Sequence, residues 1–175
     1  MNKILIVLVV FFTFLDCKSQ EVINGKLEVN PKLYETFYSN GKLKASIYML
    51  EGIANGSAKM YFRNGQLQIE EYLKNGKIDG VVKIYYKNGQ LKAEAHFIEG
   101  ILNGTTKLYY KKGQLKSEVN FINGLENGTT KMYFKNGQLK SEGNFIDGVA
   151  NGTTIYYDEK GKLLSKFFFV NGIAN

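Results

Sequence analysis

Several residue types are nearly absent from this chain of 175 residues, which has one cysteine, one histidine, one proline and no tryptophan. One cysteine can form neither an internal disulfide nor a cysteine-based zinc cluster. With a single histidine, His96, most acid–base and metal chemistries are hard to assemble. We therefore predict no catalytic residue, no metal site and no cofactor, and we expect function to reside on an extended surface.

Glycine, by contrast, is abundant and returns at a fixed interval of 24 residues. The first series consists of Gly41, Gly65, Gly89, Gly113, Gly137 and Gly161, each followed two residues later by a leucine. Two further series keep the same interval, from Gly52 to Gly172 and from Gly56 to Gly152. Such self-similarity predicts one supersecondary unit that is stacked many times, and function on a repeated surface.

The first residues have the layout of a secretory signal peptide, with Lys3 before an apolar run from Ile4 to Leu15. We assign residues 1–16 to this signal and expect an exported protein. Cys17 resembles the lipidated first residue of a mature bacterial lipoprotein, which would anchor the chain to a membrane, although Asp16 departs from that pattern. Cleavage near Ser19 or Gln20, which would discard Cys17, is the alternative.

The stretch from Thr105 to Gly128 represents the unit, with two alternating runs around a Lys-Gly turn. Most other units have Asn-Gly at this turn, which suits a two-residue type I′ hairpin loop. Such a loop at Asn136-Gly137 predicts these opposite pairs: Lys135 with Gln138, Phe134 with Leu139, Tyr133 with Lys140, Met132 with Ser141, and Lys131 with Glu142. The same register places Lys59, Lys83 and Lys107 opposite Glu70, Glu94 and Glu118, so the charges support it.

Side chains alternate across a strand, so this register divides them between two faces. Phe134, Met132 and Phe145 fall on an apolar face, whereas Tyr133 and Lys131 fall on a polar one. We predict an all-β fold in which successive antiparallel hairpins form one elongated single-sheet repeat array over residues 37–175. Residues 17–36 are interpreted as a linker and N-terminal cap.

The pattern YYxNGxLxxExxFxxGxxNG, from Tyr85 to Gly104 and again from Tyr133 to Gly152, resembles the bacterial variant of the MORN repeat. The resemblance covers about residues 37–175. It implies an antiparallel sheet of hairpins used for binding or scaffolding, with no activity of its own. Bacterial members are commonly labelled antitoxins, a label that fits poorly with an export signal, and eukaryotic members have been linked to phospholipid or protein association.

The strongest candidate binding surface is a ladder of tyrosines on the polar face, beside lysines. Its members are Tyr61, Tyr85, Tyr109, Tyr133 and Tyr157, with Lys92, Lys116 and Lys140 opposite. Such a surface could bind a protein or an envelope polymer, such as a sugar chain or a polyanion. The simpler interpretation is that tyrosine beside lysine makes good sheet surface.

Other features are weighed against simpler explanations. His96 occupies a position held by Asn120 and Asn144 in other units, so it is interpreted as a surface residue. Each lysine of the series that includes Lys107 and Lys131 faces a glutamate, which argues against nucleic acid as a partner. The run from Phe167 to Val170 either closes the core or offers an edge for self-association. Besides an envelope binding or scaffold module, an antitoxin-like cytoplasmic inhibitor and a carbohydrate-binding or adhesion module remain open.

Overall fold

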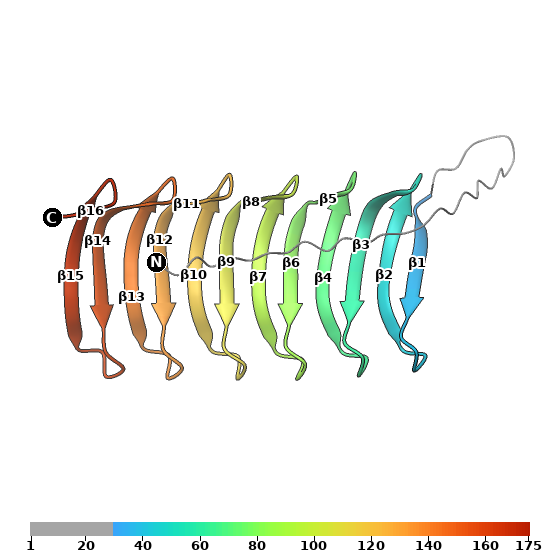
Figure 1. Ribbon diagram of the computed structural model, residues 1–175, viewed down its shortest axis with the longest axis horizontal. Helices are drawn as coiled ribbons and strands as arrows, with labels where there is room; N and C mark the ends of the chain where they lie inside the picture. The colour runs from blue at the N-terminus through green and yellow to red at the C-terminus, as the bar shows by residue number, and fades with distance from the viewer. Residues whose placement is uncertain (1–29) are drawn as a thin grey trace, which may run out of the picture.

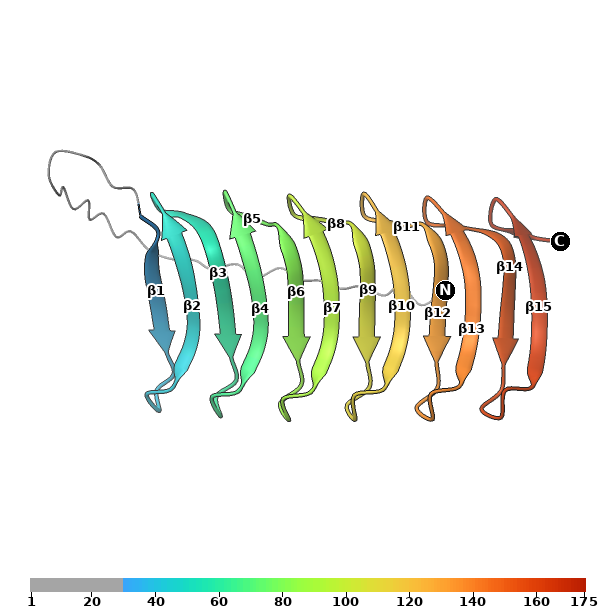
Figure 2. The ribbon, with the colours of Figure 1, turned by 180° about the vertical axis from the view of Figure 1, so that it is seen from behind.

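The computed structural model describes residues 30–175, so the predicted signal peptide, Cys17 and the linker to residue 29 lie outside the described part. Every regular element in that part is a β-strand, and all of them join one sheet (Figure 1). The strands stand side by side in chain order along the long axis, and the view from behind shows the same single layer (Figure 2). The predicted elongated array of antiparallel hairpins is confirmed.

The long strands are β1 (Lys32–Phe37), β2 (Leu43–Leu50), β3 (Ile53–Tyr61), β4 (Leu67–Lys74), β6 (Gly80–Tyr85), β7 (Leu91–Ile98), β9 (Gly104–Tyr109), β10 (Leu115–Ile122), β12 (Gly128–Tyr133), β13 (Leu139–Ile146), β14 (Val149–Tyr157) and β15 (Leu163–Val170). Four short strands complete the sheet: β5 (Lys77–Ile78), β8 (Ile101–Leu102), β11 (Leu125–Glu126) and β16 (Ile173–Ala174). The first strand, which pairs with β2, consists of residues 32–36 of the predicted linker and cap together with Phe37.

The hairpin loops that contain the first glycine series differ from the prediction. At the β12–β13 loop, the Gly137 amide donates to the Phe134 carbonyl over 3.0 Å, and the Phe134 amide donates to the Gln138 carbonyl over 2.9 Å. Gly137 has a positive φ of 86°, whereas Asn136 does not. This is a three-residue loop, in which a type I turn is followed by a left-handed glycine, and the predicted two-residue type I′ loop at Asn136-Gly137 is wrong.

Two-residue loops occur instead at the opposite end of the hairpins. Between β13 and β14, Ile146 pairs with Val149, and the two loop residues Asp147 and Gly148 have φ values of 49° and 80°. Positive φ at both central residues is the signature of a type I′ turn. The second glycine series therefore belongs to the type I′ turns.

The extra loop residue changes the pairs next to the turn but not those farther away. Tyr133 pairs with Leu139 rather than Lys140, and a β-bulge follows between Met132 and Tyr133. The predicted pairs of Phe134 with Leu139 and Lys135 with Gln138 are also wrong, because Phe134 bonds to Gln138. Since the bulge cancels the extra loop residue, Met132 pairs with Ser141 and Lys131 with Glu142, as predicted.

One face of the sheet, which we call the packing face, buries side chains along the middle of the strands. Except at Ile69, its first row alternates small and large side chains across neighbouring strands: Ala45, Met60, Ile69, Ile84, Ala93, Leu108, Ser117, Met132, Ser141, Tyr156 and Ser165. The second row includes Ile47 and Val82, the largest fully buried side chains in the described part. Small beside large side chains interdigitate at high density, which favours this sheet over an isolated hairpin.

The opposite face, which we call the charged face, has a row in which lysine and glutamate alternate from strand to strand. In sheet order the row reads Lys59, Glu70, Lys83, Glu94, Lys107, Glu118, Lys131 and Glu142. Each inner member has an opposite charge on both neighbouring strands. Cross-strand pairs of opposite charge favour this register over one that is shifted by one residue.

The last long strand continues the sheet. β15 pairs with β14 along its length, so Phe167 and Phe169 extend the packing face while Phe168 lies on the charged face. Phe167 contacts Tyr156 and Phe169, with ring centroids 6.2 and 6.3 Å apart. Phe168 is 51% exposed, so this strand does not fold over the sheet as a closing cap.

Candidate binding surface

The predicted tyrosine ladder exists as a column near one end of the sheet, and its side chains are half-buried. Tyr61, Tyr85, Tyr109, Tyr133 and Tyr157 pair with Leu67, Leu91, Leu115, Leu139 and Leu163, in that order. Successive members lie two strands apart, which corresponds to roughly 9 to 10 Å. The column is regular, but its cross-strand neighbours are leucines and not the predicted lysines.

The three predicted lysines lie over a second column of aromatic rings. The ammonium groups of Lys92 and Lys116 lie 6.0 and 5.9 Å from the ring centroids of Tyr86 and Tyr110. That of Lys140 lies 5.6 Å from the ring centroid of Phe134. These distances are within the range of cation–π attraction. The predicted lysines are thus brought to aromatic rings, each to the residue that follows a ladder tyrosine.

This second column also joins neighbouring units through hydrogen bonds. The hydroxyls of Tyr38, Tyr86 and Tyr110 donate to the carbonyl oxygens of Tyr61, Tyr109 and Tyr133, over 2.7, 2.8 and 2.8 Å. The acceptor is therefore the backbone of a ladder tyrosine in the next unit. Sequence analysis missed this role, although the Tyr-Tyr doublets at residues 85–86 and 109–110 repeat with the period of the unit.

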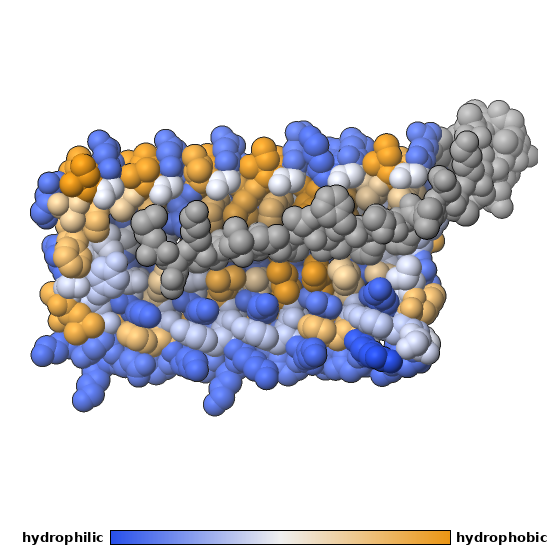
Figure 3. Space-filling model, viewed as in Figure 1, coloured by the Kyte–Doolittle hydropathy of each residue, from blue (hydrophilic) through white to orange (hydrophobic). Residues whose placement is uncertain are grey.

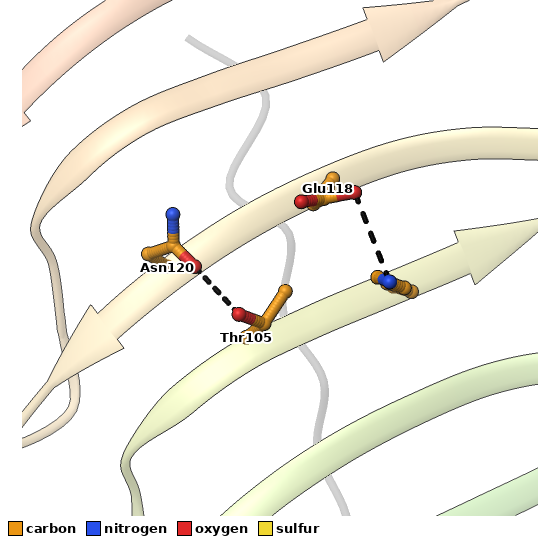
Figure 4. Close-up of polar contacts among 4 residues, drawn as sticks. Thr105, Glu118 and Asn120 are labelled. Carbon is orange, nitrogen blue, oxygen red and sulfur yellow. Dashed lines mark hydrogen bonds and ion pairs between the residues drawn. The ribbon is translucent and has the colours of Figure 1, made fainter.

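Polar contacts on the charged face order the side chains that flank the ladder. The ammonium of Lys59 lies 3.4 Å from the Glu70 carboxylate, and that of Lys107 lies 4.0 Å from Glu118. Figure 4 shows the Glu118 contact beside a second one, in which the Thr105 hydroxyl donates to the Asn120 side-chain oxygen over 2.7 Å. The four side chains of the two ion pairs are more than a third exposed, so each ion pair contributes little to stability.

The two ends of the hairpins carry opposite charge. The end with three-residue loops, which we call the basic end, presents Lys42, Arg63, Lys87, Lys111, Lys112, Lys135, Lys160 and Lys162, against Asp158 and Glu159 in the last loop. This end forms the lower, hydrophilic rim in Figure 3. The other end, the acidic end, presents Glu51, Asp79, Glu99, Glu126 and Asp147, with Lys74 and Lys77. The surplus of positive charge is therefore displayed at one rim.

Side-chain amides tie neighbouring loops together at the basic end. Asn40, Asn88 and Asn136 each donate to a carbonyl of the next loop, that of Arg63, Lys111 and Glu159, over 3.2, 3.1 and 2.8 Å. At the acidic end, Asn55, Asn103 and Asn127 donate to side-chain oxygens of Asn75, Asn123 and Asp147. Both rims are thus held in a regular spacing from unit to unit.

Two carboxyl groups are perturbed by burial. Desolvation raises the pKa of Glu71, which is 6% exposed on the packing face and has one carboxylate oxygen without a hydrogen-bond partner. Burial also raises the pKa of Glu126, opposed by a hydrogen bond with Thr130. Glu71 lies opposite Ala58 in the register, so it faces no second carboxylate of the kind that acid–base pairs require.

His96 pairs with Val81 on the charged face, where its Cβ would lie 3.2 Å from a Cβ added to Gly104. Within residues 30–175, no group of three or more His, Cys, Asp or Glu side chains is arranged to hold a metal ion. That same part of the chain has no helix of the length and hydrophobicity needed to cross a membrane.

Comparison with known families agrees with this architecture. The family described as MORN repeat variant matches six segments, at residues 32–50, 54–75, 78–99, 102–123, 126–147 and 150–171. Among curated proteins, none matches this chain. The first matched segment includes β1, so the strand that precedes the first glycine loop counts as part of the repeats. Arrays of this repeat are generally associated with binding or scaffold roles. Since the matched segments cover most of the chain and coincide with its hairpins, this protein belongs to the MORN repeat variant family.

Proposed function

We propose that this protein is an exported, non-catalytic binding or scaffold module of the bacterial envelope. The observation that carries the proposal is that three consecutive hairpins present the same arrangement of an aromatic pair and a lysine at the same place on a single layer, whereas Gln68 and Leu164 take the lysine position in the units on either side. A repeated surface of this kind suits a partner that makes several equivalent contacts. The apolar run from Ile4 to Leu15 and Cys17 behind it support export and a lipid anchor.

The proposed contact surface combines the ladder tyrosines with the three lysines that lie over the neighbouring aromatic column. It consists of Tyr61, Tyr85, Tyr109, Tyr133, Tyr157, Lys92, Lys116 and Lys140. The lysines are exposed and lie over rings, so they can exchange an intramolecular contact for one with a partner at small cost. Aromatic and cationic side chains together are typical of interface centres.

Localisation is tested by fractionating cells and measuring the mass of the mature N-terminus. We expect the protein in the membrane fraction, with a chain that begins at a lipidated Cys17. Replacing Cys17 with Ser should release it from that fraction. An uncleaved chain in the cytoplasm would overturn the export proposal and favour an antitoxin-like inhibitor.

The contact surface is tested on a partner cross-linked in the envelope, identified by mass spectrometry and then purified. Changing Lys92, Lys116 and Lys140 together to Ser should weaken its affinity by about tenfold or more, because interface contacts of charged side chains are worth over a kcal/mol. A matched variant changes Lys83, Lys107 and Lys131 to Ser, which lie on the charged face and already have glutamate neighbours. Equal weakening in both variants, or none in the first, would refute the proposed surface.

A further inference from the structure

An open pocket of about 720 Å³ lies at the basic end, across three consecutive loops. Tyr86 and Asn88 line it from the β6–β7 loop, and Lys135 lines it from the β12–β13 loop. Between them, the β9–β10 loop contributes Tyr110, Lys111, Lys112 and Gln114. Every charged side chain that lines this pocket is a lysine.

The pocket lysines differ from Lys59 and Lys107 of the charged face in their partners. Lys59 and Lys107 lie within 4.0 Å of a glutamate on the neighbouring strand. Lys111, Lys112 and Lys135 form no ion pair with any carboxylate among residues 30–175. Three like charges without a counter-charge on neighbouring loops repel one another and attract an anion. Two more cations, Lys92 and Lys116, lie about 6 Å from the rings of Tyr86 and Tyr110 that line the pocket.

The pocket coincides with a break in the repeat. At most loops of the basic end an asparagine precedes the glycine, and Asn88 and Asn136 use their amides to bond the next loop. Lys112 replaces this asparagine in the β9–β10 loop. In the described part, no corresponding side-chain amide bond links that loop to the β12–β13 loop. The charged side chain of Lys112 therefore stands where other loops have a hydrogen-bonding amide. The last loop also has a lysine here, Lys160, but in the β9–β10 loop the replacement coincides with the gathering of Lys111, Lys112 and Lys135, which indicates a local function.

We propose that this pocket binds a compact polyanion that carries several closely spaced phosphate groups. Lysines from two loops that lie two strands apart, roughly 9 to 10 Å, can contact more than one anionic group of the same ligand. Lysine binds phosphate as a point charge, whereas planar carboxylates are typically recognised by the arginine fork. No arginine lines the pocket. The amides of Asn88 and Gln114 add neutral donors at its margin.

The test is calorimetric titration of the purified protein with tripolyphosphate at about 0.15 M salt, where diffuse surface attraction is largely screened. We expect saturable binding of one ligand per chain. Changing Lys111, Lys112 and Lys135 together to Gln should weaken binding by about tenfold or more, since hydrogen bonds to charged groups are the strong ones. The matched control changes Lys42, Lys160 and Lys162 to Gln, which removes the same charge from the same rim away from the pocket, and should weaken binding less than about twofold.

A single substitution makes the test sharper. Lys112→Asn restores the residue found at most other loops, so the fold should persist, as circular dichroism and the melting temperature would show, while affinity for tripolyphosphate falls. Citrate at equal charge should bind more weakly than tripolyphosphate. The proposal is overturned if wild type does not bind, if the two triple variants weaken equally, if citrate binds as tightly, or if only vesicles of anionic lipid are bound.

Discussion

The two faces of this sheet are built from the same strands by the same alternation, yet they stabilise the protein in different ways. The packing face buries Ile47, Val82 and Val119 to 2% exposure or less. The charged face alternates lysine and glutamate whose paired side chains remain more than a third exposed. Burial of apolar area is worth more than exposed ion pairs, so the packing face should supply most of the stability and the charged face most of the register.

The packing face thus contributes most to the free energy of unfolding, and the charged face contributes mainly to the choice of strand register. On the packing face, a shift by one residue would expose every buried side chain. On the charged face, the same shift would remove each lysine from its glutamate. Both faces therefore select the observed register, but a substitution should have very different effects on the two.

Removing a buried side chain from the packing face should have the largest effect. Ile47→Ala should lower the free energy of unfolding by about 2 to 4 kcal/mol, because it removes buried methyl groups and leaves a cavity. Urea denaturation measures the change. The control is Ile122→Ala at a 52% exposed position, which should change stability by less than about 0.5 kcal/mol. Equal losses would show that burial does not distinguish these positions.

Glu71→Val should stabilise the protein, by about 1 to 3 kcal/mol at neutral pH, because it removes a buried carboxylate that has one oxygen without a hydrogen-bond partner. Val119 occupies the equivalent place two units later, so valine fits there. Burial raises the pKa of Glu71 above 4.5, so the native state binds this proton more tightly than the unfolded state. Wild-type stability due to this group is then greatest below pH 4.5 and falls as pH rises through the raised pKa.

The increase in the free energy of unfolding caused by Glu71→Val should therefore be small in acid and grow as pH rises above 4.5. Thermal unfolding of wild type and variant over a pH series measures it. Glu71→Gln serves as the control, because it removes the charge and keeps the polar group. A gain that is constant with pH would show that the carboxylate is not desolvated.

Tyr110→Phe removes the hydroxyl that joins β9 to the next unit. We expect a loss of about 1 kcal/mol, the usual net value of one hydrogen bond, since the Tyr133 carbonyl loses its donor. Phe62 and Phe134 occupy the same position in other units, so the ring is compatible with the site. The control is Tyr72→Phe, at a 50% exposed position, which should be neutral when measured by urea denaturation.

Charge reversal on the charged face should have the smallest effect. Glu118→Lys places three lysines in a row with Lys107 and Lys131, and should cost less than about 1 kcal/mol. The loss should shrink further at about 1 M salt, where such charges are screened. Glu118→Gln, which removes attraction without adding repulsion, should cost less than Glu118→Lys. A larger loss that resists salt would show that this ladder supports the fold and not only its register.

Much of the fold could be read from period and alternation, because both depend on local chemistry. The charge series that pairs Lys131 with Glu142 requires one register whatever the turn between them. The turn itself was mispredicted, since Asn-Gly suits both a two-residue type I′ loop and a three-residue loop with a left-handed glycine. At Asn136-Gly137 the last bonded pair before the turn is Phe134 with Gln138, which leaves a loop of three residues instead of two. The bulge at Lys140 restores the predicted pairing from Met132 and Ser141 onward.

The candidate site was predictable in part for a similar reason. Lys92, Lys116 and Lys140 could be assigned to aromatic neighbours, but the sequence suggested the ladder tyrosines. The bulge moves these lysines over Tyr86, Tyr110 and Phe134 instead. The basic pocket could not be foreseen, because Lys111, Lys112 and Lys135 come from two loops that only sheet stacking brings together.

By itself, the sequence determined the repeat, the strand class and the division of side chains between two faces, because glycine spacing and alternation act over a few residues. The tertiary structure decided which turn each glycine series makes, which aromatic rings the lysines cover, and that positive charge gathers at one rim. Those features depend on how each hairpin is placed beside the next, and neighbouring hairpins meet through residues 23 positions apart in the chain.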